Sequence, residues 1–364
     1  MKCRAAIAYE VNQPLVIDTI EVDGPGPGEV LVEIKATGLC HTDLHAIEGK
    51  NSDMINFPGI AGHEAGGVVV EVGKGVSTLN VGDHVIPFIC SECGKCSYCT
   101  SGKTNLCLEM FTGHEKVSRC SHAGTRLFPF FDLGTFANYG VYREINLAKV
   151  RKDAPFEQIA YLGCGATTGL GAALFTAKVQ RGSSVIVFGL GGIGLNIVQG
   201  ARIAGASIIV GIDTNPTKEA LARRLGATHF VNPQTLGEAL VGHLNEITGG
   251  GADYAFEAVG QVDLMRKTFE CTKLGWGVCT VVGMSPSGQP MQVLPIDLLL
   301  GRKLQGTAMG GAKCRTDLPR LVDHLVEKRF DLESLITHKL PLERINDGFE
   351  MMKRGESIRS VVVF

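Results

Sequence analysis

Four cysteines lie close together in one short segment: Cys93, Cys96, Cys99 and Cys107. Four thiolates at these spacings can close a tetrahedral zinc site that leaves no position for a substrate. An iron–sulfur cluster usually has its fourth cysteine three residues on, followed by proline, and neither feature is present. A nucleic-acid zinc module needs a basic surround, which Lys95 and Lys103 alone do not provide. The spacing predicts a structural zinc, with Cys90 as a surplus free cysteine.

A glycine-rich segment, Gly189-Leu190-Gly191-Gly192-Ile193-Gly194, has the spacing G-x-G-x-x-G and directly follows an apolar run. Such glycines let the backbone and the next helix N-terminus approach a pyrophosphate. Asp213 ends the following apolar run, where a carboxylate accepts hydrogen bonds from a ribose diol and repels a 2′-phosphate. Lys218, one helical turn further on, is expected at the ribose edge. The segment therefore predicts NAD binding in preference to NADP.

A third group is dispersed over the chain: Cys40-His41-Thr42-Asp43, Gly62-His63-Glu64 and Gly163-Cys164-Gly165. Two thiolates and one imidazole would hold a zinc with one open position, as catalytic zinc sites require. Sequence spacing alone cannot pair residues that lie so far apart. The residue types therefore allow a reactive metal site without defining its ligands.

The elements that must position these residues fall into two patterns. Residues 30–37 alternate apolar and polar side chains, which indicates a half-buried strand in a β-rich region of about 165 residues. From Ser183 onward, apolar strands alternate with helices, as in a doubly wound α/β domain. The strands expected there are 184–188, 207–212, 229–232, 253–259 and 277–283, and the helices include 192–204 and 216–225. The tail predicts helices near 316–329 and 342–354 and a closing strand at 360–364, and it could return to either part.

Composition excludes several classes of protein. The chain has 364 residues, of which 45% are hydrophobic and 20% charged, and its formal net charge is −2. This balance is neither that of a disordered chain nor that of a basic nucleic-acid-binding protein. The longest apolar region is interrupted by polar residues, and the N-terminus does not resemble a signal peptide. We therefore expect a cytoplasmic protein without nucleic-acid or membrane partners, in which clustered cysteines bind metal instead of forming disulfides.

Taken together, the motifs resemble the zinc-dependent medium-chain alcohol dehydrogenases, of the dimeric class I and class III branch, over essentially the whole chain. The matching segments are 38–43, 62–64, 93–107, 163–165, 189–194, Asp213, Lys218 and 357–359. The resemblance implies an α/β protein with a GroES-like β-rich catalytic domain (1–165 and 309–364) and a Rossmann domain (166–308), which has a doubly wound parallel sheet. It also implies NAD and two zinc ions per chain, one catalytic and one structural.

The resemblance also assigns roles to single residues. Cys40, His63 and Cys164 would hold the catalytic zinc, and Cys93, Cys96, Cys99 and Cys107 the structural one. Thr42 and His45 would relay the alcohol proton to solvent, although His45 could instead be an ordinary surface histidine. Asp43 would accept a hydrogen bond from His63, and Glu64 would either approach the metal or pair with Arg359. The cofactor contacts would be His41, Arg359, Val282, Thr307 and Met309, besides Gly189, Gly191, Gly192, Gly194, Asp213 and Lys218. Zinc would lower the pKa of the substrate hydroxyl, and hydride would pass to NAD.

Two positions bear on the substrate. Glutathione-dependent formaldehyde dehydrogenases, which belong to this family, usually carry tyrosine where this chain has His45. They also carry a carboxylate-binding arginine where it has Phe111. We therefore expect an uncharged, medium-to-bulky primary alcohol or its aldehyde, including aromatic or terpenoid ones. The channel would be lined by Ile89, Phe111, Phe130 and Phe131, although the phenylalanines could equally be core residues.

The sequence also allows two alternative functions and predicts a state of assembly. S-(hydroxymethyl)glutathione oxidation is the alternative activity. A non-enzymatic zinc or NADH sensor is the alternative of another class. The long loop between Cys107 and Gly134, and a strand near 301–309, point to the homodimer formed through the Rossmann domain in this family.

Overall fold

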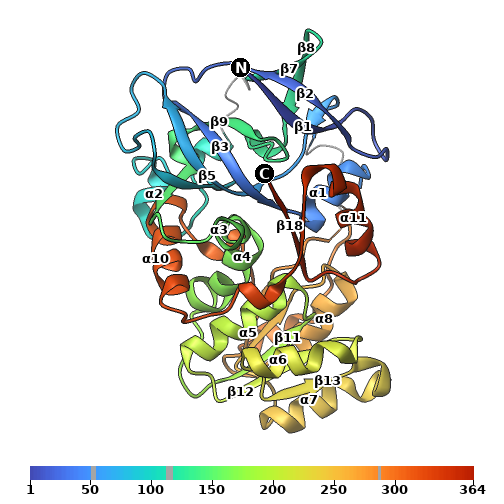
Figure 1. Ribbon diagram of the computed structural model, residues 1–364. Coiled ribbons are helices and arrows are strands. Elements are labelled where there is room, and N and C mark those ends of the chain that lie inside the picture. Colours follow the sequence, from blue (N-terminus) through green and yellow to red (C-terminus); the bar gives the residue numbers. More distant parts are fainter. Residues whose placement is uncertain (51–54, 112–117, 286–287) are drawn as a thin grey trace. The chain divides into compact units, whose positions relative to one another are not determined.

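The computed structural model describes residues 1–50, 55–111, 118–285 and 288–364 (Figure 1). The chain divides into two compact units: unit 1 contains Met1–Cys164 and Lys313–Phe364, and unit 2 contains Gly165–Ala312. The boundaries therefore lie at 164/165 and 312/313, where the sequence suggested 165/166 and 308/309. Residues 309–312 fall in unit 2 because Gly310 packs closely on α4 (Gly165–Gly171); a Cβ on Gly310 would lie 2.4 Å from the Thr167 carbonyl.

Unit 1 is β-rich and contains two sheets. A seven-stranded sheet has the order β10-β6-β5-β3-β18-β17, with β9 also paired to β3. Its strands are β3 (Glu29–Gly38), β5 (Glu64–Val72), β6 (His84–Pro87), β9 (Tyr139–Arg143), β10 (Leu147–Val150), β17 (Ile336–Leu340) and β18 (Arg359–Val363). In β3, Val30, Val32 and Ile34 pack in one core cluster, as the alternation predicts, but Leu31 on the opposite face is also buried, in a second core cluster, so the strand is more than half buried.

The second sheet of unit 1 is a closed barrel, β1-β2-β7-β8-β4. Its strands are β1 (Lys2–Ala8), β2 (Val16–Val22), β4 (Gly59–Ile60), β7 (Cys120–His122) and β8 (Thr125–Pro129). The segment between Cys107 and Gly134, expected as a loop, thus contributes two barrel strands. Its residues 112–117 lie outside the described part of the chain.

The C-terminal tail returns to unit 1, which resolves the question that the sequence left open. β18 pairs antiparallel with β3, so strand 359–363 lies beside strand 29–38 (Figure 1). The helices of unit 1 are α1 (His41–Ile47), α2 (Ser97–Ser101), α3 (Phe156–Leu162), α10 (Cys314–Val326) and α11 (Ile345–Lys353). Both helices expected in the tail are present, displaced by one to three residues at their ends.

Unit 2 contains a six-stranded sheet of order β13-β12-β11-β14-β15-β16, in which every described pairing is parallel. Numbered along the unit, this order is 3-2-1-4-5-6, the arrangement of a dinucleotide-binding Rossmann fold. The strands are β11 (Ser184–Phe188), β12 (Ile208–Ile212), β13 (His229–Val231), β14 (Tyr254–Glu257), β15 (Val278–Val281) and β16 (Lys303–Gly306). The remaining helices are α5 (Gly192–Ala204), α6 (Glu219–Leu225), α7 (Leu240–Thr248), α8 (Val262–Glu270) and α9 (Pro295–Leu299).

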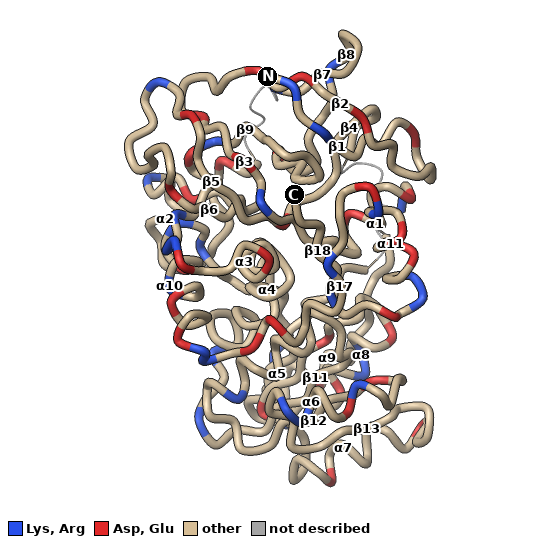
Figure 2. Tube along the Cα trace, in the orientation of Figure 1, with Lys and Arg blue, Asp and Glu red and all other residues tan. Residues whose placement is uncertain are grey.

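Charged residues are distributed over both units. Lysine and arginine alternate with aspartate and glutamate along the chain in Figure 2, without a continuous basic stripe along any labelled element. Within the described residues, no single helix is long and apolar enough to cross a membrane. The bent pair formed by residues 156–162 and 165–176 meets that criterion jointly, by length and composition alone.

Candidate active site and metal centres

Unit 1 brings the dispersed metal-binding residues together. The potential ligand atoms of Cys40, His63, Glu64 and Cys164 all lie within 4.8 Å of one another, and all four residues are buried. Strand pairing explains part of this convergence, because Gly38 at the end of β3 is in register with Glu64 at the start of β5. Cys40 and His63 therefore leave neighbouring strand ends.

A close backbone approach delivers the third ligand. Gly163 ends α3 directly before Cys164, and a Cβ on Gly163 would lie 3.1 Å from the Glu64 Cα. A residue with a side chain would push α3 away from β5 and carry Cys164 with it. The glycine therefore places a residue from far along the chain beside Cys40.

His63 is oriented for metal binding by Asp43. The His63 Nδ1 lies 2.8 Å from Asp43 Oδ1, which also accepts a hydrogen bond from the Gly62 N–H at 3.0 Å. The Cys40 N–H donates to Asp43 Oδ2 at 3.3 Å. The His63 Nε2 is buried without a hydrogen-bond partner among the described residues. An Nδ1–H that donates to a carboxylate leaves Nε2 with a free lone pair, so the site fits a metal ion.

The two catalytic-site cysteines differ electrostatically. The Cys164 thiol holds the pKa of Cys40 well below its ordinary value, and the pKa of Cys164 is raised because Cys40 is its neighbour. Cysteine binds metal as the thiolate, so zinc binding there releases a proton.

Glu64 and Arg359 form a buried ion pair beside these ligands. Arg359 Nη1 lies 3.1 Å from Glu64 Oε1 and donates to the Leu39 carbonyl at 2.5 Å, and its guanidinium lies over the Tyr161 ring. Burial raises the pKa of Glu64 to about 8, although Arg359 opposes the shift. Glu64 thus belongs to the metal-ligand group and is also paired with Arg359, so the geometry accommodates both roles suggested for it. A pyrophosphate contact by Arg359 stays a prediction.

Helix α1 carries the residues expected to relay protons. Thr42 Oγ1 lies 3.6 Å from Cys40 Sγ. The His41 and His45 rings contact edge to face, with centroids 6.4 Å apart. His45 is partly buried, and burial lowers its pKa below 6.5. Its imidazole is therefore neutral at pH 7 and able to accept a proton. The relay itself, and the cofactor contact of His41, stay predictions.

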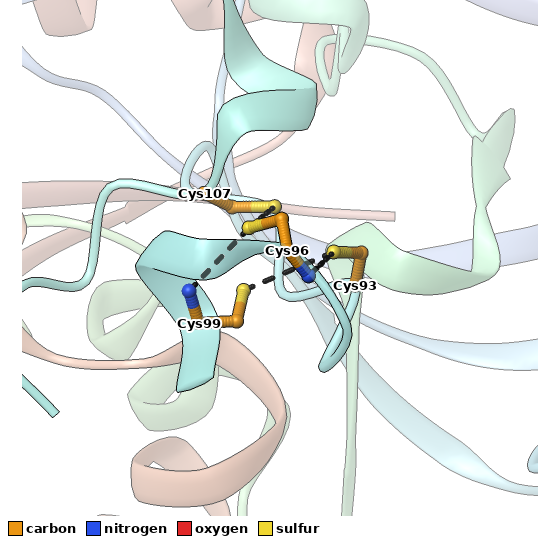
Figure 3. A group of neighbouring side chains, drawn as sticks. All are labelled: Cys93, Cys96, Cys99 and Cys107. Carbon is orange, nitrogen blue, oxygen red and sulfur yellow. Dashed lines mark hydrogen bonds between the residues drawn. The ribbon is translucent and has the colours of Figure 1, made fainter. Parts of the chain in front are cut away.

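The other cysteine group converges as the spacing predicts. The sulfurs of Cys93, Cys96, Cys99 and Cys107 point toward one another (Figure 3) and lie within 4.8 Å of one another. Two of the sulfur–sulfur distances are 3.9 Å, near the ~3.8 Å expected for four sulfurs arranged tetrahedrally around one zinc. The Cys99 N–H donates to Cys96 Sγ and lowers the pKa of that thiol to about 6. Cys90 lies outside the group and is buried.

The glycine-rich segment of unit 2 has the geometry of a dinucleotide turn. Gly189 follows β11 with φ +88°, and α5 starts at Gly192 with Gly191 as its N-cap. A Cβ on Gly194 would lie 1.7 Å from the Gly189 carbonyl, so the turn admits no side chain there. Nothing described lies within 4 Å of a Cβ built on Gly191. The turn therefore leaves open space at a helix N-terminus, which fits a pyrophosphate.

The other expected cofactor residues lie at the carboxyl ends of the same parallel strands. Asp213 follows β12, and its Oδ2 accepts hydrogen bonds from the Leu190 N–H at 2.8 Å and from Lys218 Nζ at 2.9 Å. Val282 follows β15, while Thr307 and Met309 follow β16. Ligands of open parallel sheets bind at this edge. The contacts themselves stay predictions.

The expected substrate channel is only partly assembled around the metal ligands. The Phe130 and Phe131 rings lie tilted with their centroids 4.2 Å apart and meet the His63 ring edge-on at 5.8 and 5.9 Å. Phe130 is also buried in a core cluster of unit 1, and Phe131 packs against that cluster, so both residues contribute to the core as well. Phe131 has φ +52°, an uncommon conformation for a bulky residue, and Asp132 after it has φ +60°. Ile89 instead packs against the core cluster of β3 and β5, and Phe111 is 63% exposed. The expectation that Phe111 lines an enclosed substrate channel is therefore wrong.

Some site residues were missed by the sequence analysis. Tyr161 lies under Arg359, and Glu257 ends β14 with a completely buried carboxylate. A charged residue at the end of an otherwise apolar run, as in Tyr254–Glu257, was the available signal for Glu257.

A Rossmann sheet with an open glycine turn, in a chain that also holds two convergent sets of metal ligands, defines a zinc-containing nucleotide-dependent dehydrogenase. The comparisons agree. Residues 26–152 match the alcohol dehydrogenase GroES-like domain, and residues 192–327 match the zinc-binding dehydrogenase family. The chain is 47% identical to an S-(hydroxymethyl)glutathione dehydrogenase of Paracoccus denitrificans, over 100% of both chains. It is 45% identical to a class-3 alcohol dehydrogenase of Dictyostelium discoideum, over 99% of this chain and 97% of the relative.

A solved structure is similar over the same range. The benzyl alcohol dehydrogenase of Acinetobacter calcoaceticus superimposes with a TM-score of 0.92 at 31% identity, covering 100% of this chain and 99% of that one. The chain therefore belongs to the zinc-dependent medium-chain alcohol dehydrogenases. It is an NAD-dependent oxidoreductase that uses two zinc ions and acts on a small-molecule alcohol or aldehyde. Family membership thus favours the enzyme over the sensor alternative.

Proposed function

We propose that this enzyme interconverts medium-to-bulky, apolar or aromatic primary alcohols and their aldehydes. The observation that carries the proposal is the adjacent pair Phe130 and Phe131, whose rings contact the His63 ring. Aromatic walls beside the ligand set favour a substrate whose reacting carbon bears an apolar group. Phe111, where an arginine would bind the carboxylate of a glutathione adduct, offers no charge.

The residues of unit 1 have separable tasks in this reaction. Cys40, His63 and Cys164 would hold the catalytic zinc, and Asp43 would fix the His63 ring through Nδ1. When bound, zinc acts as a Lewis acid on the substrate oxygen and NAD accepts the hydride. The Thr42 hydroxyl would receive the alcohol proton, and the neutral His45 ring would pass it to solvent. Phe130 and Phe131 would exclude water from the reacting carbon.

S-(hydroxymethyl)glutathione is the second candidate substrate. The names of the relatives in Paracoccus denitrificans and Synechocystis favour it. The discriminating experiment compares kcat/KM for benzyl alcohol, octanol and S-(hydroxymethyl)glutathione with NAD. We expect kcat/KM for benzyl alcohol and for octanol to exceed kcat/KM for S-(hydroxymethyl)glutathione. A strong preference for the adduct would overturn the apolar assignment.

Variants connect this preference to the site. Phe131→Ala should lower kcat/KM for benzyl alcohol by about 10-fold, the effect of losing a few buried methylene equivalents of contact. The matched control is Phe111→Ala, whose exposed ring should leave that value unchanged. Both variants should retain two zinc ions per chain. Equal effects of the two substitutions would contradict the assigned wall.

We also propose that the enzyme is a homodimer formed through unit 2, in the cytoplasm. β16 is an edge strand, and exposed apolar side chains surround it: Leu294, Ile296, Leu299, Leu300 and Leu304. An exposed edge with such a patch favours pairing with a second copy. Twelve free cysteines, six of them in the two ligand sets, support a reducing compartment.

Sedimentation tests the assembly. Leu299, which is 81% exposed in a single chain, should become buried in the dimer. Leu299→Asp should therefore sediment as a monomer, while Val81→Asp, at an exposed valine of unit 1, should remain dimeric. A monomeric wild-type enzyme at micromolar concentration would refute this proposal.

A further inference from the structure

Glu257 lies at one of the strand ends that form the nucleotide-binding edge of unit 2. It is the last residue of β14, and its side chain is completely buried. Its Oε1 accepts hydrogen bonds from three successive backbone amides, those of Val259, Gly260 and Gln261, at 3.0, 2.8 and 3.3 Å. One carboxylate oxygen thus determines the path of the whole loop after β14.

The main chain of Glu257 holds a second loop. Its carbonyl accepts hydrogen bonds from the Val282 and Gly283 amides, both at 2.9 Å, at the point where the chain leaves β15. Side chain and carbonyl together therefore make five hydrogen bonds to two neighbouring loops. No other group described at this edge of the sheet is bonded to both loops.

The loops that Glu257 holds are packed without spare room against the dinucleotide turn. A Cβ on Gly189 would lie 2.5 Å from Val259 Cγ2, and one on Gly283 would lie 2.2 Å from the Gly260 amide nitrogen. A shift of the 258–261 loop would therefore displace both the first glycine of the turn and the segment that begins at Val282.

The chemistry of the carboxylate fits this task. Burial raises the pKa of Glu257, while the amides of Gly260, Val259 and Gln261 oppose the shift. Its Oε2 is buried without a partner among the described residues, and a Cβ on Gly283 would lie 2.8 Å from it. A buried acceptor left half satisfied is costly, and such groups persist where they hold a functional geometry.

We propose that Glu257 is a positioning residue for NAD: by holding the loops 258–261 and 282–283 against Gly189, it gives the cofactor site its shape before NAD arrives. The inference relies on NAD binding at the glycine turn and is independent of which alcohol the enzyme oxidises. Glu257 is completely buried and acts on the cofactor site through these two loops.

Two variants separate the reach of the side chain from its charge. Glu257→Asp keeps the charge but is one methylene shorter, so its oxygen cannot reach all three amides. Glu257→Gln keeps the reach, since its amide oxygen can replace Oε1. We expect Glu257→Asp to raise the Kd for NADH by about 10-fold, and Glu257→Gln by no more than about 3-fold. At saturating NAD, kcat should change little in either variant.

Asp253, at the opposite end of β14, provides the matched control. Its Oδ2 accepts hydrogen bonds from the Ser184 N–H at 2.9 Å and from the Ser184 hydroxyl at 3.0 Å. Asp253→Asn should therefore lower the Tm without changing the Kd for NADH. If Glu257 has a purely structural role, Glu257→Asp and Asp253→Asn should both lower the Tm, and neither should change the Kd for NADH.

NADH binding is measured by its fluorescence on titration with two-zinc enzyme, alongside the Tm. Wild-type-like NADH binding by Glu257→Asp would overturn the proposal, as would an equal loss in Asp253→Asn. Hydrogen exchange of the wild-type enzyme gives a test that needs no variant. The amides of Val259, Gly260 and Val282 should be protected before NADH is added, and rapid exchange that slows only with NADH would equally refute the proposal.

Discussion

Replacing Asp43 by asparagine should selectively weaken the catalytic metal site. The Asp43 carboxylate is fully buried and accepts hydrogen bonds from His63, Gly62 and Cys40. In Asp43→Asn, one side-chain oxygen can still accept from His63 Nδ1 and from the Gly62 amide. The other position becomes an NH2 group that faces the Cys40 N–H, so two donors meet where a donor and an acceptor met before.

The expected loss has two sources. Removal of the negative charge weakens the bond that orients the His63 ring and lowers the basicity of its Nε2. Losing such a carboxylate partner typically costs 10- to 100-fold in metal affinity, or about 1.4 to 2.7 kcal/mol. The donor–donor clash at Cys40 acts on a second ligand, so we expect about 100-fold, the upper end of that range.

The assay is zinc content by mass spectrometry during titration with a chelator. One zinc per chain should be released from Asp43→Asn at about 100-fold lower chelator activity than from the wild type, while the second remains bound. Asp83→Asn is the control, because Asp83 is also buried and accepts from the Asn80 amide and Lys149, away from either cysteine group. Equal zinc retention by Asp43→Asn and the wild type would refute the role given to Asp43, as would equal zinc loss from Asp83→Asn.

Three further predictions concern other parts of unit 1. His45→Gln should lower kcat at pH 7 by about 10-fold, below the usual range for direct acid–base groups because the ring acts through Thr42. Since burial lowers the pKa of His45, wild-type kcat should fall as pH drops through that pKa, below 6.5, and the variant should lack this limb in a pH–rate profile. Cys107→Ser should bind one zinc per chain and have a lower Tm, whereas Cys90→Ser should keep two by metal analysis, because Cys90 lies outside the ligand set. Glu92→Ala should lower the free energy of unfolding in urea by about 1 to 2 kcal/mol, since its carboxylate accepts from two amides at the start of α10; an unchanged midpoint would contradict this.

Local elements were predictable because their signals are local. The expected helix 192–204 coincides with α5, since glycines at its start, apolar periodicity along it and Gly205 after it act within a few residues. The helix expected at 216–225 is divided into a 3-10 turn at Pro216–Lys218, with proline near its start, and α6. The Cys93–Cys107 group was equally accessible, since all four ligands come from one segment.

The catalytic ligand set could not be predicted from the spacing of its residues in the sequence. Cys40, His63 and Cys164 meet only because β3 pairs with β5 and because Gly163 allows α3 to approach Glu64. These are tertiary relations, and only the family resemblance supplied them. Likewise, β7 and β8 were missed because strands of three and five residues carry too little alternation to be distinguished from a loop.

The order in which the chain is synthesised has a consequence for unit 1. β18 occupies the place between β3 and β17, and it consists of residues 359–363 of a chain of 364. Until those residues are made, the Ala36–Gly38 end of β3 lacks the pairing that β18 provides, although Glu29–Glu33 can already pair with β9, and Glu64 lacks the guanidinium of Arg359. The residues of unit 2 are contiguous, so unit 2 can complete its sheet before β18 of unit 1 has been synthesised. A nascent or truncated chain that stops before Arg359 would leave this part of the sheet edge open to neighbouring polypeptides, so β18 completes the sheet of unit 1.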